Sequence, residues 1–216
     1  MGKLDVTGAF IKAIFNLPML LFILFAILIG IIKSYLNSKK GKGKLAETVV
    51  TKKLELSLDK ERYTIYRDLI VPDKFGYTQI DILVVSVYGI FVIEVKNFSG
   101  KIYAYEHGNV WIQYLHGKKS EFQNPIKQNY RHIKALSEYL LVPISKFNPV
   151  VLFIGDATFK TAIPKGVLTS NCKTYIESFS EVIITTKELQ QIKGALNKLE
   201  ADKNKLLLEF KKQRQA

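Results

Sequence analysis

The sequence predicts an α/β fold, with a mixed sheet flanked by helices, preceded by one N-terminal transmembrane helix. Three observations predict it: an uncharged apolar run near the N-terminus, nearly continuous apolar runs of strand length in mid-chain, and helical spacing of apolar residues around them. With 216 residues, 48% of them hydrophobic, the chain is long enough for one globular domain and an appendage. It is too apolar for a disordered protein.

The N-terminal run covers residues 13–32, which carry no charge and are mostly Leu, Ile and Phe. This is the length and composition of a helix that crosses the hydrocarbon core of a bilayer. Residues 1–12 would then form a short extracytoplasmic N-terminus. A secretory signal peptide is the main alternative, but no small-residue cleavage site follows before Lys33. A core helix of a soluble fold would normally carry a polar face.

Residues 33–44 form a basic segment that is typical of a flexible juxtamembrane linker. Its lysines could touch anionic lipid headgroups. By the positive-inside rule, they also place everything after them in the cytoplasm, with a single pass through the cell membrane. These lysines are Lys33, Lys39, Lys40, Lys42 and Lys44, whereas the other flank offers Lys3 and Lys12 opposed by Asp5.

The whole chain is basic, with 32 Lys and Arg against 19 Asp and Glu and a net charge of +13, and the part after residue 44 alone keeps +7. This balance suits a polyanionic partner, either nucleic acid or an anionic membrane surface. The single cysteine, Cys172, is expected to be a buried small residue. It cannot form an internal disulfide, and no Cys/His group has zinc spacing, so a reducing compartment is expected.

Residues 45–186 are expected to form the main domain and residues 187–216 a C-terminal charged amphipathic helix. The predicted elements are a helix at 45–58, strands at 63–71, 79–86 and 90–95, a hairpin of 101–105 and 110–114, a helix from Asn124-Pro125 to about Leu141, a strand at 149–154 and a short strand at 182–185. The last helix mixes eight basic and four acidic residues, which suits a solvated face as well as a phosphate-contacting one.

Three charged residues interrupt runs that otherwise look buried. Asp81 lies within the run 79–86, and Glu94 and Lys96 lie within the run 89–96. Because side chains alternate along a strand, Glu94 and Lys96 share one face. Buried charges need a partner or a metal, and adjacent carboxylates repel unless a cation lies between them. The alternative is a cross-strand ion pair on a solvated sheet face.

Two carboxylates and a nearby ammonium fit hydrolysis of a phosphodiester. Hard carboxylate oxygens hold Mg²⁺ or Mn²⁺, and the metal polarises the phosphate and lowers the pKa of a bound water. The lysine would orient or deprotonate that water.

The stretches Thr78-Gln79-Ile80-Asp81, then Tyr88 to Asn97 with Glu94-Val95-Lys96, then Asn124-Pro125-Ile126-Lys127-Gln128-Asn129-Tyr130 together resemble the NERD (nuclease-related) domain. This family is a branch of the PD-(D/E)XK nuclease superfamily, and the resemblance covers roughly residues 41 to 140. It implies a restriction-endonuclease-like fold. It also implies a membrane-anchored, metal-dependent nuclease that acts on DNA, with RNA as the second choice.

The resemblance also implies roles for individual residues. The implied catalytic set is Asp81, Glu94, Lys96, Glu47 and Gln128, and the implied metal ligands are Asp81, Glu94, the carbonyl of Val95 and Glu47. Lys96 would be the catalytic lysine, and Gln128 would position water or phosphate. Without the resemblance, Glu47 is an ordinary glutamate in the first turns of a helix. Ile82 departs from the family pattern, in which many members have a polar residue there, often His.

Other chemistry-bearing residues have plainer interpretations. The three histidines, His107, His116 and His132, have no ligand spacing among themselves, so each is expected to make hydrogen bonds or lie at the surface. Trp111, with Tyr103, Tyr105 and Tyr114, could stack on bases, but packing of one hairpin face against a helix is favoured.

Two other functions remain open. The alternative to an enzyme is a catalytically weak nuclease fold that binds nucleic acid or a protein partner at the membrane. An anionic-lipid contact made by the linker and the last helix is the third. The sequence leaves the oligomeric state open.

Overall fold

The computed structural model describes residues 17–214, and the chain divides into two compact units, Met1–Leu45 and Ala46–Ala216. The first unit contains α2 (Leu17–Asn37) and the start of α3 (Lys39–Ser57). The second contains the rest of α3 and every strand.

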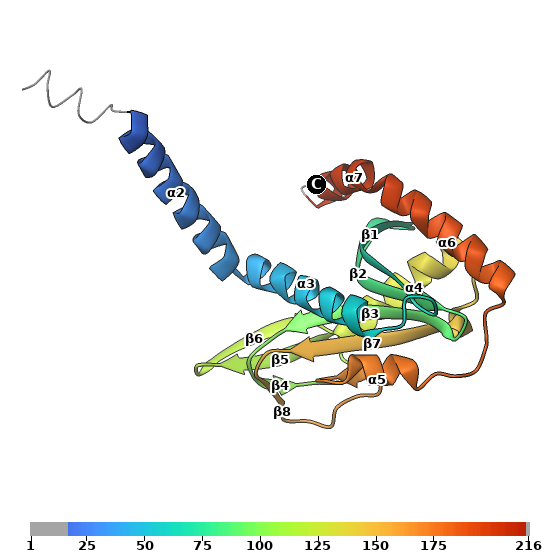
Figure 1. Cartoon of the computed structure of the whole chain (residues 1–216). Coiled ribbons are helices and arrows are strands. Elements are labelled where there is room, and N and C mark those ends of the chain that lie inside the picture. The colour runs from blue at the N-terminus through green and yellow to red at the C-terminus, as the bar shows by residue number, and fades with distance from the viewer. Residues whose placement is uncertain (1–16, 215–216) are drawn as a thin grey trace, which may run out of the picture. The chain divides into compact units, whose positions relative to one another are not determined.

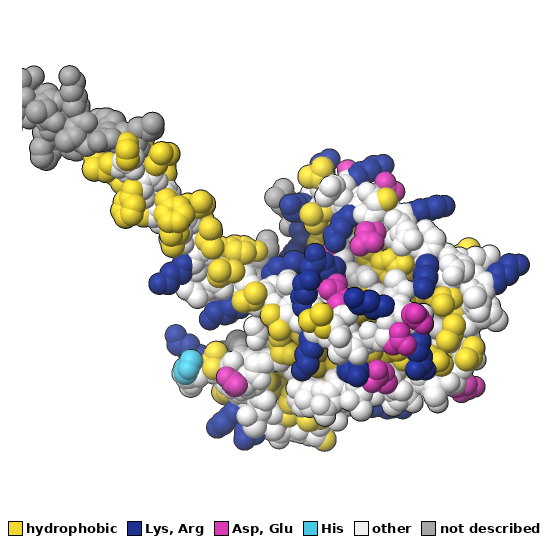
Figure 2. Space-filling model, in the orientation of Figure 1, with side chains coloured by type: hydrophobic (Ala, Val, Ile, Leu, Met, Phe, Trp, Pro, Cys, Tyr) yellow, Lys and Arg dark blue, Asp and Glu magenta, His cyan; other side chains and the backbone are white. Residues whose placement is uncertain are grey.

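Helix α2 is long and apolar enough to cross a membrane, with a mean hydropathy of 2.5 over the span Pro18–Asn37. Its large hydrophobic side chains are exposed along the helix (Figure 2), and a core helix would bury such side chains. The predicted span begins at residue 13. Its first four residues, like the predicted N-terminus of residues 1–12, lie outside the described residues.

The basic segment between α2 and the domain is helical. Helix α3 begins at Lys39, and the Oγ of Ser38 accepts a hydrogen bond of 3.0 Å from the amide of Gly41, as a serine does at a helix N-terminus. The expectation of a flexible linker over residues 33–44 is therefore wrong in its secondary structure. The predicted opening helix at 45–58 is confirmed as the second half of α3.

The main sheet has five strands in the order β1-β2-β3-β7-β9 (Figure 1). They are β1 (Thr64–Asp73), β2 (Gly76–Ser86), β3 (Gly89–Asn97), β7 (Phe147–Ile154) and β9 (Val167–Leu168). The first three form an antiparallel meander, and β7 and β9 continue the sheet in parallel with β3. The sheet is therefore mixed, as predicted.

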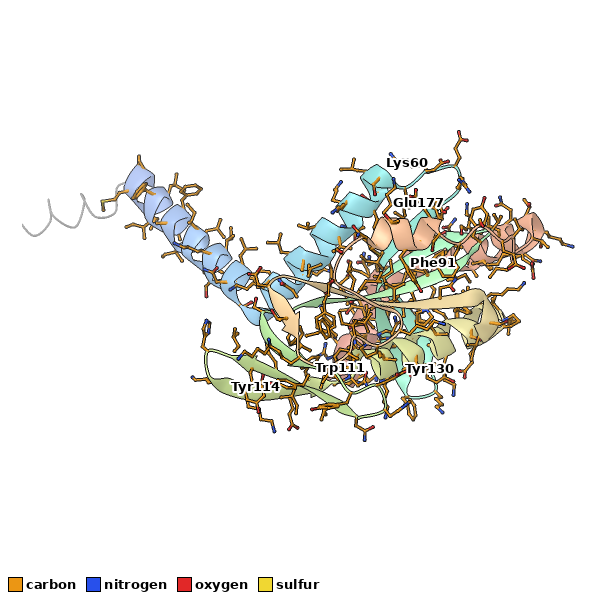
Figure 3. All side chains as sticks on the ribbon, turned by 90° about the horizontal axis from the view of Figure 1, so that it is seen from below. Lys60, Phe91, Trp111, Tyr114, Tyr130 and Glu177 are labelled. Atoms are coloured by element: carbon orange, nitrogen blue, oxygen red, sulfur yellow. The ribbon has the colours of Figure 1, made fainter. Side chains whose placement is uncertain are left out.

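Helices cover both faces of this sheet. On one face, α4 (Pro125–Leu140) and α6 (Thr186–Ala201) pack their apolar residues against β1, β2 and β3. On the other, α3 and α5 (Cys172–Glu177) pack around Phe91 (Figure 3). The ring of Phe91 contacts the ring of Phe179 edge to face, with their centroids 5.1 Å apart. Burial on both faces explains why β2 and β3 are nearly continuous apolar runs.

A second sheet has four strands in the order β6-β5-β4-β8. They are β4 (Gly100–Tyr103), β5 (Val110–Leu115), β6 (Lys118–Gln123) and β8 (Ala157–Phe159). Its inner face buries Ile102 and Trp111 completely, in a cluster with Phe153 of β7. The short helices η1 (Ile144–Lys146) and α7 (Lys203–Gln213) complete the fold.

Helix α4 begins where the sequence predicts. The Oδ1 of Asn124 accepts a hydrogen bond of 2.9 Å from the amide of Ile126, and Pro125 follows at the first helical position. The Nδ2 of Asn124 donates to the carbonyls of Tyr105, Glu106 and Gly108. This buried side chain therefore ties the start of α4 to the β4–β5 loop.

Two predicted elements are wrong. Residues 182–185 are not a strand, because the amides of Ile183 and Ile184 both donate to the carbonyl of Val87 instead of joining a ladder. The C-terminal helix is two helices, which meet at Asp202. Strands β6, β8 and β9 and helix α5 lack a predicted counterpart.

Cys172 is buried at the start of α5, as expected. Burial raises the pKa of its thiol to about 11. The thiol is therefore protonated at neutral pH and packs as a small apolar group.

Candidate active site

The predicted acidic residues lie on two adjoining strands. The β2–β3 ladder runs outward to the pair Ile82 and Ile93, and Asp81 and Glu94 are the next positions on each strand. Beyond the ladder, the amide of Val95 donates to the Oδ2 of Asp81 at 2.9 Å. A carboxylate thus accepts the hydrogen bond at the point where the two strands stop pairing.

Lys96 joins this pair to helix α4. Its Nζ donates to the Oε1 of Glu94 at 2.6 Å and to the Oε1 of Gln128 at 3.0 Å. Glu94 is almost completely buried, whereas Lys96 keeps 17% of its side chain exposed. The structure therefore brings together Asp81, Glu94, Lys96 and Gln128, which the sequence could place only by resemblance and strand alternation.

A buried histidine also contacts Glu94. His132 lies one helical turn after Gln128, and its Nε2 is 3.1 Å from the Oε2 of Glu94. Its Nδ1 is 2.8 Å from the Oγ1 of Thr78 on β2. A carboxylate only accepts hydrogen bonds, so Nε2 carries a proton, and in the neutral ring Nδ1 accepts from the Thr78 hydroxyl.

The two carboxyl groups have opposite pKa shifts. Burial, followed by the charges of Glu94 and Glu47, raises the pKa of Asp81 well above its usual value, against the opposing hydrogen bond from Val95. Burial alone would also raise the pKa of Glu94, but the hydrogen bond from His132 and the charge of Lys96 hold it below its usual range. Asp81 is therefore harder to ionise than Glu94.

Glu47 lies on α3 and is close enough to Asp81 for its charge to contribute to that shift. Within residues 17–214, however, no three His, Cys, Asp or Glu side chains are grouped closely enough to hold a metal ion. The side-chain donors that fit a hard divalent cation are the carboxylates of Asp81 and Glu94. A cation bound between these two buried carboxylates would relieve the repulsion between them.

The aromatic residues of the hairpin divide between its two faces. Trp111 is fully buried, but it stacks on Phe153 of strand β7 and not on a helix, so the expected packing of the hairpin aromatics against a helix is wrong in its partner. Tyr105 and Tyr114 are instead exposed, by 48% and 39%. Each histidine was expected to lie at the surface or to make hydrogen bonds. His107 and His116 are exposed, and His132 is hydrogen-bonded to Glu94.

Asn129 was not singled out from the sequence. Its Nδ2 donates to the carbonyls of Val92 at 2.8 Å and Val150 at 2.9 Å, which binds α4 to two neighbouring strands. The signal for both Asn129 and His132 was present: each is a polar residue on the apolar side of an amphipathic helix.

Replacing Asp81 by asparagine is expected to stabilise the metal-free protein at neutral pH. The amide oxygen can still accept from Val95, while the unfavourable buried charge is lost. Fluorescence of Trp111, the single tryptophan, would show a melting temperature raised by roughly 2–4 °C, the effect of about 1 kcal/mol in a domain of this size.

The pH dependence of this gain has a definite sign. A raised folded-state pKa means that ionisation destabilises the fold above the unfolded-state pKa of about 3.9 and has no effect well below it. The difference between Asp81→Asn and the unaltered protein should therefore vanish in acid. A variant that melts lower at neutral pH would contradict the electrostatic assignment.

Replacing Thr78 by valine is expected to lower the free energy of unfolding by about 1–2 kcal/mol, because the buried Nδ1 of His132 loses its hydrogen-bond partner. Thr78→Ser keeps the hydroxyl and should melt close to the unaltered protein. Equal melting temperatures for the valine and serine variants would show that the Thr78–His132 bond contributes nothing.

Comparisons with known proteins agree with this arrangement. Residues 42–154 match the model of the NERD family, described as the nuclease-related domain. The chain is also 36% identical over 179 residues to an "uncharacterized protein" of Bacillus anthracis, pXO1-01. That alignment covers 79% of this chain and 82% of the relative.

Proposed function

Because the chain belongs to the nuclease-related domain family, we propose that it is a metal-dependent nuclease that hydrolyses phosphodiester bonds of DNA, with RNA as the second choice. The observation that carries this proposal is the placement of Asp81, Glu94 and Lys96 at one point on adjoining strands, with Gln128 above them on α4. Fold alone would not support a reaction, but this group of side chains does.

Asp81 and Glu94 would hold Mg²⁺ or Mn²⁺ through carboxylate oxygens, with the carbonyl of Val95 and the carboxylate of Glu47 completing the shell. Such an ion, when bound, polarises the scissile phosphate and lowers the pKa of a coordinated water. His132 and Thr78 fix the orientation of the Glu94 carboxylate, so that it does not have to be ordered when the substrate arrives.

Lys96, as an ammonium, would orient the attacking water by donating to it and would stabilise negative charge on the phosphate. Its Nζ is held by Glu94 and Gln128, so its position is fixed before substrate binds. Gln128 can use its Nε2 to donate to water or a phosphate oxygen while its Oε1 accepts from Lys96.

The test is a cleavage assay on the full-length chain in mild detergent. Supercoiled, linear and single-stranded DNA and an RNA strand are incubated with Mg²⁺, Mn²⁺ or EDTA. Cleavage of at least one substrate that requires a metal and disappears in Asp81→Ala supports the proposal. Absence of cleavage of every form, or full activity in Asp81→Ala, would rule it out.

One observation favours a second function, a module that binds nucleic acid or a protein partner at the membrane without effective catalysis. Both oxygens of Glu94 already have partners, Lys96 and His132, so a metal must compete for them. Salt-dependent DNA binding that survives Lys96→Ala, with no product at any enzyme concentration, would select this function.

The proposed location is the cytoplasmic face of the cell membrane, with α2 as a single-pass anchor. The length and apolar character of α2 support an anchor, and the lysines after it support a cytoplasmic domain. Those five lysines, Lys33, Lys39, Lys40, Lys42 and Lys44, would also contact anionic lipid headgroups.

Membrane fractionation tests the anchor. The full chain with a C-terminal tag should stay in the membrane after a carbonate wash, and its intact mass should include the N-terminal residues. A chain that lacks residues 1–38 should be released. A membrane-free chain shortened at its N-terminus would instead identify α2 as part of a signal peptide.

A further inference from the structure

The second sheet has an outer face whose composition the core does not explain. We call it the tyrosine face; it consists of Lys101, Tyr103, Ile112, Tyr114, Lys119 and Glu121. These residues share one side because Lys101 and Tyr103 alternate with the fully buried Ile102. The register then aligns Lys101, Tyr114 and Lys119 in one row across three strands.

The aromatic residues of the opposite face are explained by packing. Trp111 stacks on Phe153 with ring centroids 5.9 Å apart and an interplanar angle of 15°, and Phe122 and Phe159 meet Trp111 edge to face. These rings fill the space between the sheet and β7. The tyrosine face points the other way, so its rings are not part of this core.

On the tyrosine face, the two rings support each other. Tyr103 and Tyr114 lie diagonally across β4 and β5, with centroids 5.5 Å apart and an interplanar angle of 67°. This edge-to-face contact holds the rings in place. Tyr114 is 39% exposed, and Figure 3 shows it out on the hairpin, while Trp111 lies nearer the centre of the domain.

Positive charge flanks the rings. Lys101 and Lys119 are the cross-strand neighbours of Tyr114 on either side, and both are exposed. Lys160, which follows β8, is also exposed at the edge beside β4. Glu121 is the one acid of the face, and it pairs with Lys119 at 3.4 Å. A ligand bound on this face would therefore contact aromatic rings that have lysine side chains on both sides.

We propose that the tyrosine face binds a single strand of nucleic acid, with bases stacked on Tyr103 and Tyr114 and phosphates held by Lys101, Lys119 and Lys160. Aromatic rings that alternate with basic side chains on an open sheet are the combination that unpaired strands need, because every base has a face that stacks. Duplex bases are already stacked on each other and offer no such face.

This inference deepens the proposed nuclease function, on which it rests, by naming the form of substrate. Strand β4 begins four residues after Lys96, so no more than about 18 Å of chain separates Lys96 from Lys101. A protein partner would need a more apolar surface: the aliphatic side chains on this side of β5 are Ile112 and, at the start of the strand, Val110, and lysines flank the rings.

The test is fluorescence anisotropy with the full chain in mild detergent and EDTA, so that binding is measured without cleavage. The probes are labelled strands of about 12 nucleotides: oligo-dT, oligo-U, a strand whose sugars carry no bases, and a DNA duplex. Vesicles containing phosphatidylglycerol are the separate arm for a lipid surface.

The double variant Tyr103→Ala, Tyr114→Ala should bind oligo-dT or oligo-U at least about tenfold more weakly. Its binding to the strand without bases and to the duplex should not change. Tyr114→Phe keeps the ring and should bind normally. Tyr130→Ala is the matched control, because Tyr130 is 50% exposed on α4 and lies well away from Tyr114 (Figure 3).

The lysines should show their role in the salt dependence. Changing Lys101 and Lys119 to glutamine should lower the slope of log affinity against log salt for oligo-dT by about 1.4, which corresponds to two phosphates. Trp111 fluorescence checks that each variant is folded. If the double variant is unfolded, Tyr114→Ala alone, whose ring is exposed, provides the same comparison.

Normal binding of oligo-dT and oligo-U by a folded tyrosine variant would overturn the inference, and so would a defect confined to the vesicles. The proposed function fails separately. If the protein cleaves nucleic acid but binds single strands normally without the tyrosines, the proposed nuclease function stands and the inference about the tyrosine face is wrong. If it needs the tyrosines for binding but never cleaves, the inference stands and the proposed nuclease function is wrong.

Discussion

Replacing Lys96 by methionine is expected to lower the rate of metal-dependent cleavage at least about 100-fold. The Lys96 ammonium is fixed between Glu94 and Gln128, at 2.6 and 3.0 Å, and methionine keeps much of the chain length but neither the charge nor the donors. The rate should be measured under single-turnover conditions with the most rapidly cleaved substrate, so that product release does not mask the chemical step.

Lys198→Met is the matched control, since Lys198 is exposed on α6 and far in sequence from the site. It should cleave at the rate of the unaltered protein. Binding of DNA in EDTA should survive in Lys96→Met. A Lys96→Met protein that cleaves at an unchanged rate would remove the lysine from the mechanism.

The second large effect is on stability, at Asn124. Asn124→Ala is expected to lower the free energy of unfolding by about 3 kcal/mol, because α4 loses its N-terminal cap and three loop carbonyls lose their donor. The melting temperature reported by Trp111 should fall by roughly 6–12 °C. Cleavage should also weaken, since α4 carries Gln128 and His132.

Two variants separate these contributions. Asn124→Ser keeps an uncharged oxygen that can cap the helix but lacks the amide that donates to the three carbonyls, so its melting temperature should fall between those of the unaltered protein and Asn124→Ala. Asn204→Ala changes an exposed asparagine of α7 and should have little effect. If Asn124→Ala lowers the melting temperature no more than Asn204→Ala does, Asn124 does not anchor the start of α4.

The sequence was most informative where a charge interrupts an apolar strand. Asp81, Glu94 and Lys96 could be singled out because burial of an unpaired charge costs several kcal/mol, and two-residue alternation placed Glu94 and Lys96 together. The structure agrees for Lys96 and Glu94, which form an ion pair. It adds that Asp81 is held by a backbone amide, which side-chain patterns do not reveal.

His132 and Thr78 were missed for a different reason. The spacing of the three histidines among themselves carries no signal for His132, because the relevant spacing is the helical one between His132 and Gln128. Thr78 is a polar residue near the start of an apolar strand, and its partner is 54 positions away in sequence. A contact over that separation follows from the tertiary fold and not from local pattern.

The errors in secondary structure have similar causes. Ile184 is completely buried, so residues 182–185 have the apolar character of a strand without a strand partner. Strand β6 has almost no apolar residues, and it is specified by its pairing with β5 and by Phe122 against Trp111. In both places, tertiary contact overrides local pattern.

The most direct measurement of the central claim is the rate of nucleic-acid cleavage by the full-length protein as a function of Mn²⁺ and Mg²⁺ concentration, with Asp81→Ala measured in parallel. The account predicts a rate that saturates with metal for the unaltered protein, is absent in EDTA, and is lost in Asp81→Ala at every metal concentration. Equal cleavage in EDTA and in metal, or a metal response that Asp81→Ala retains, would contradict it.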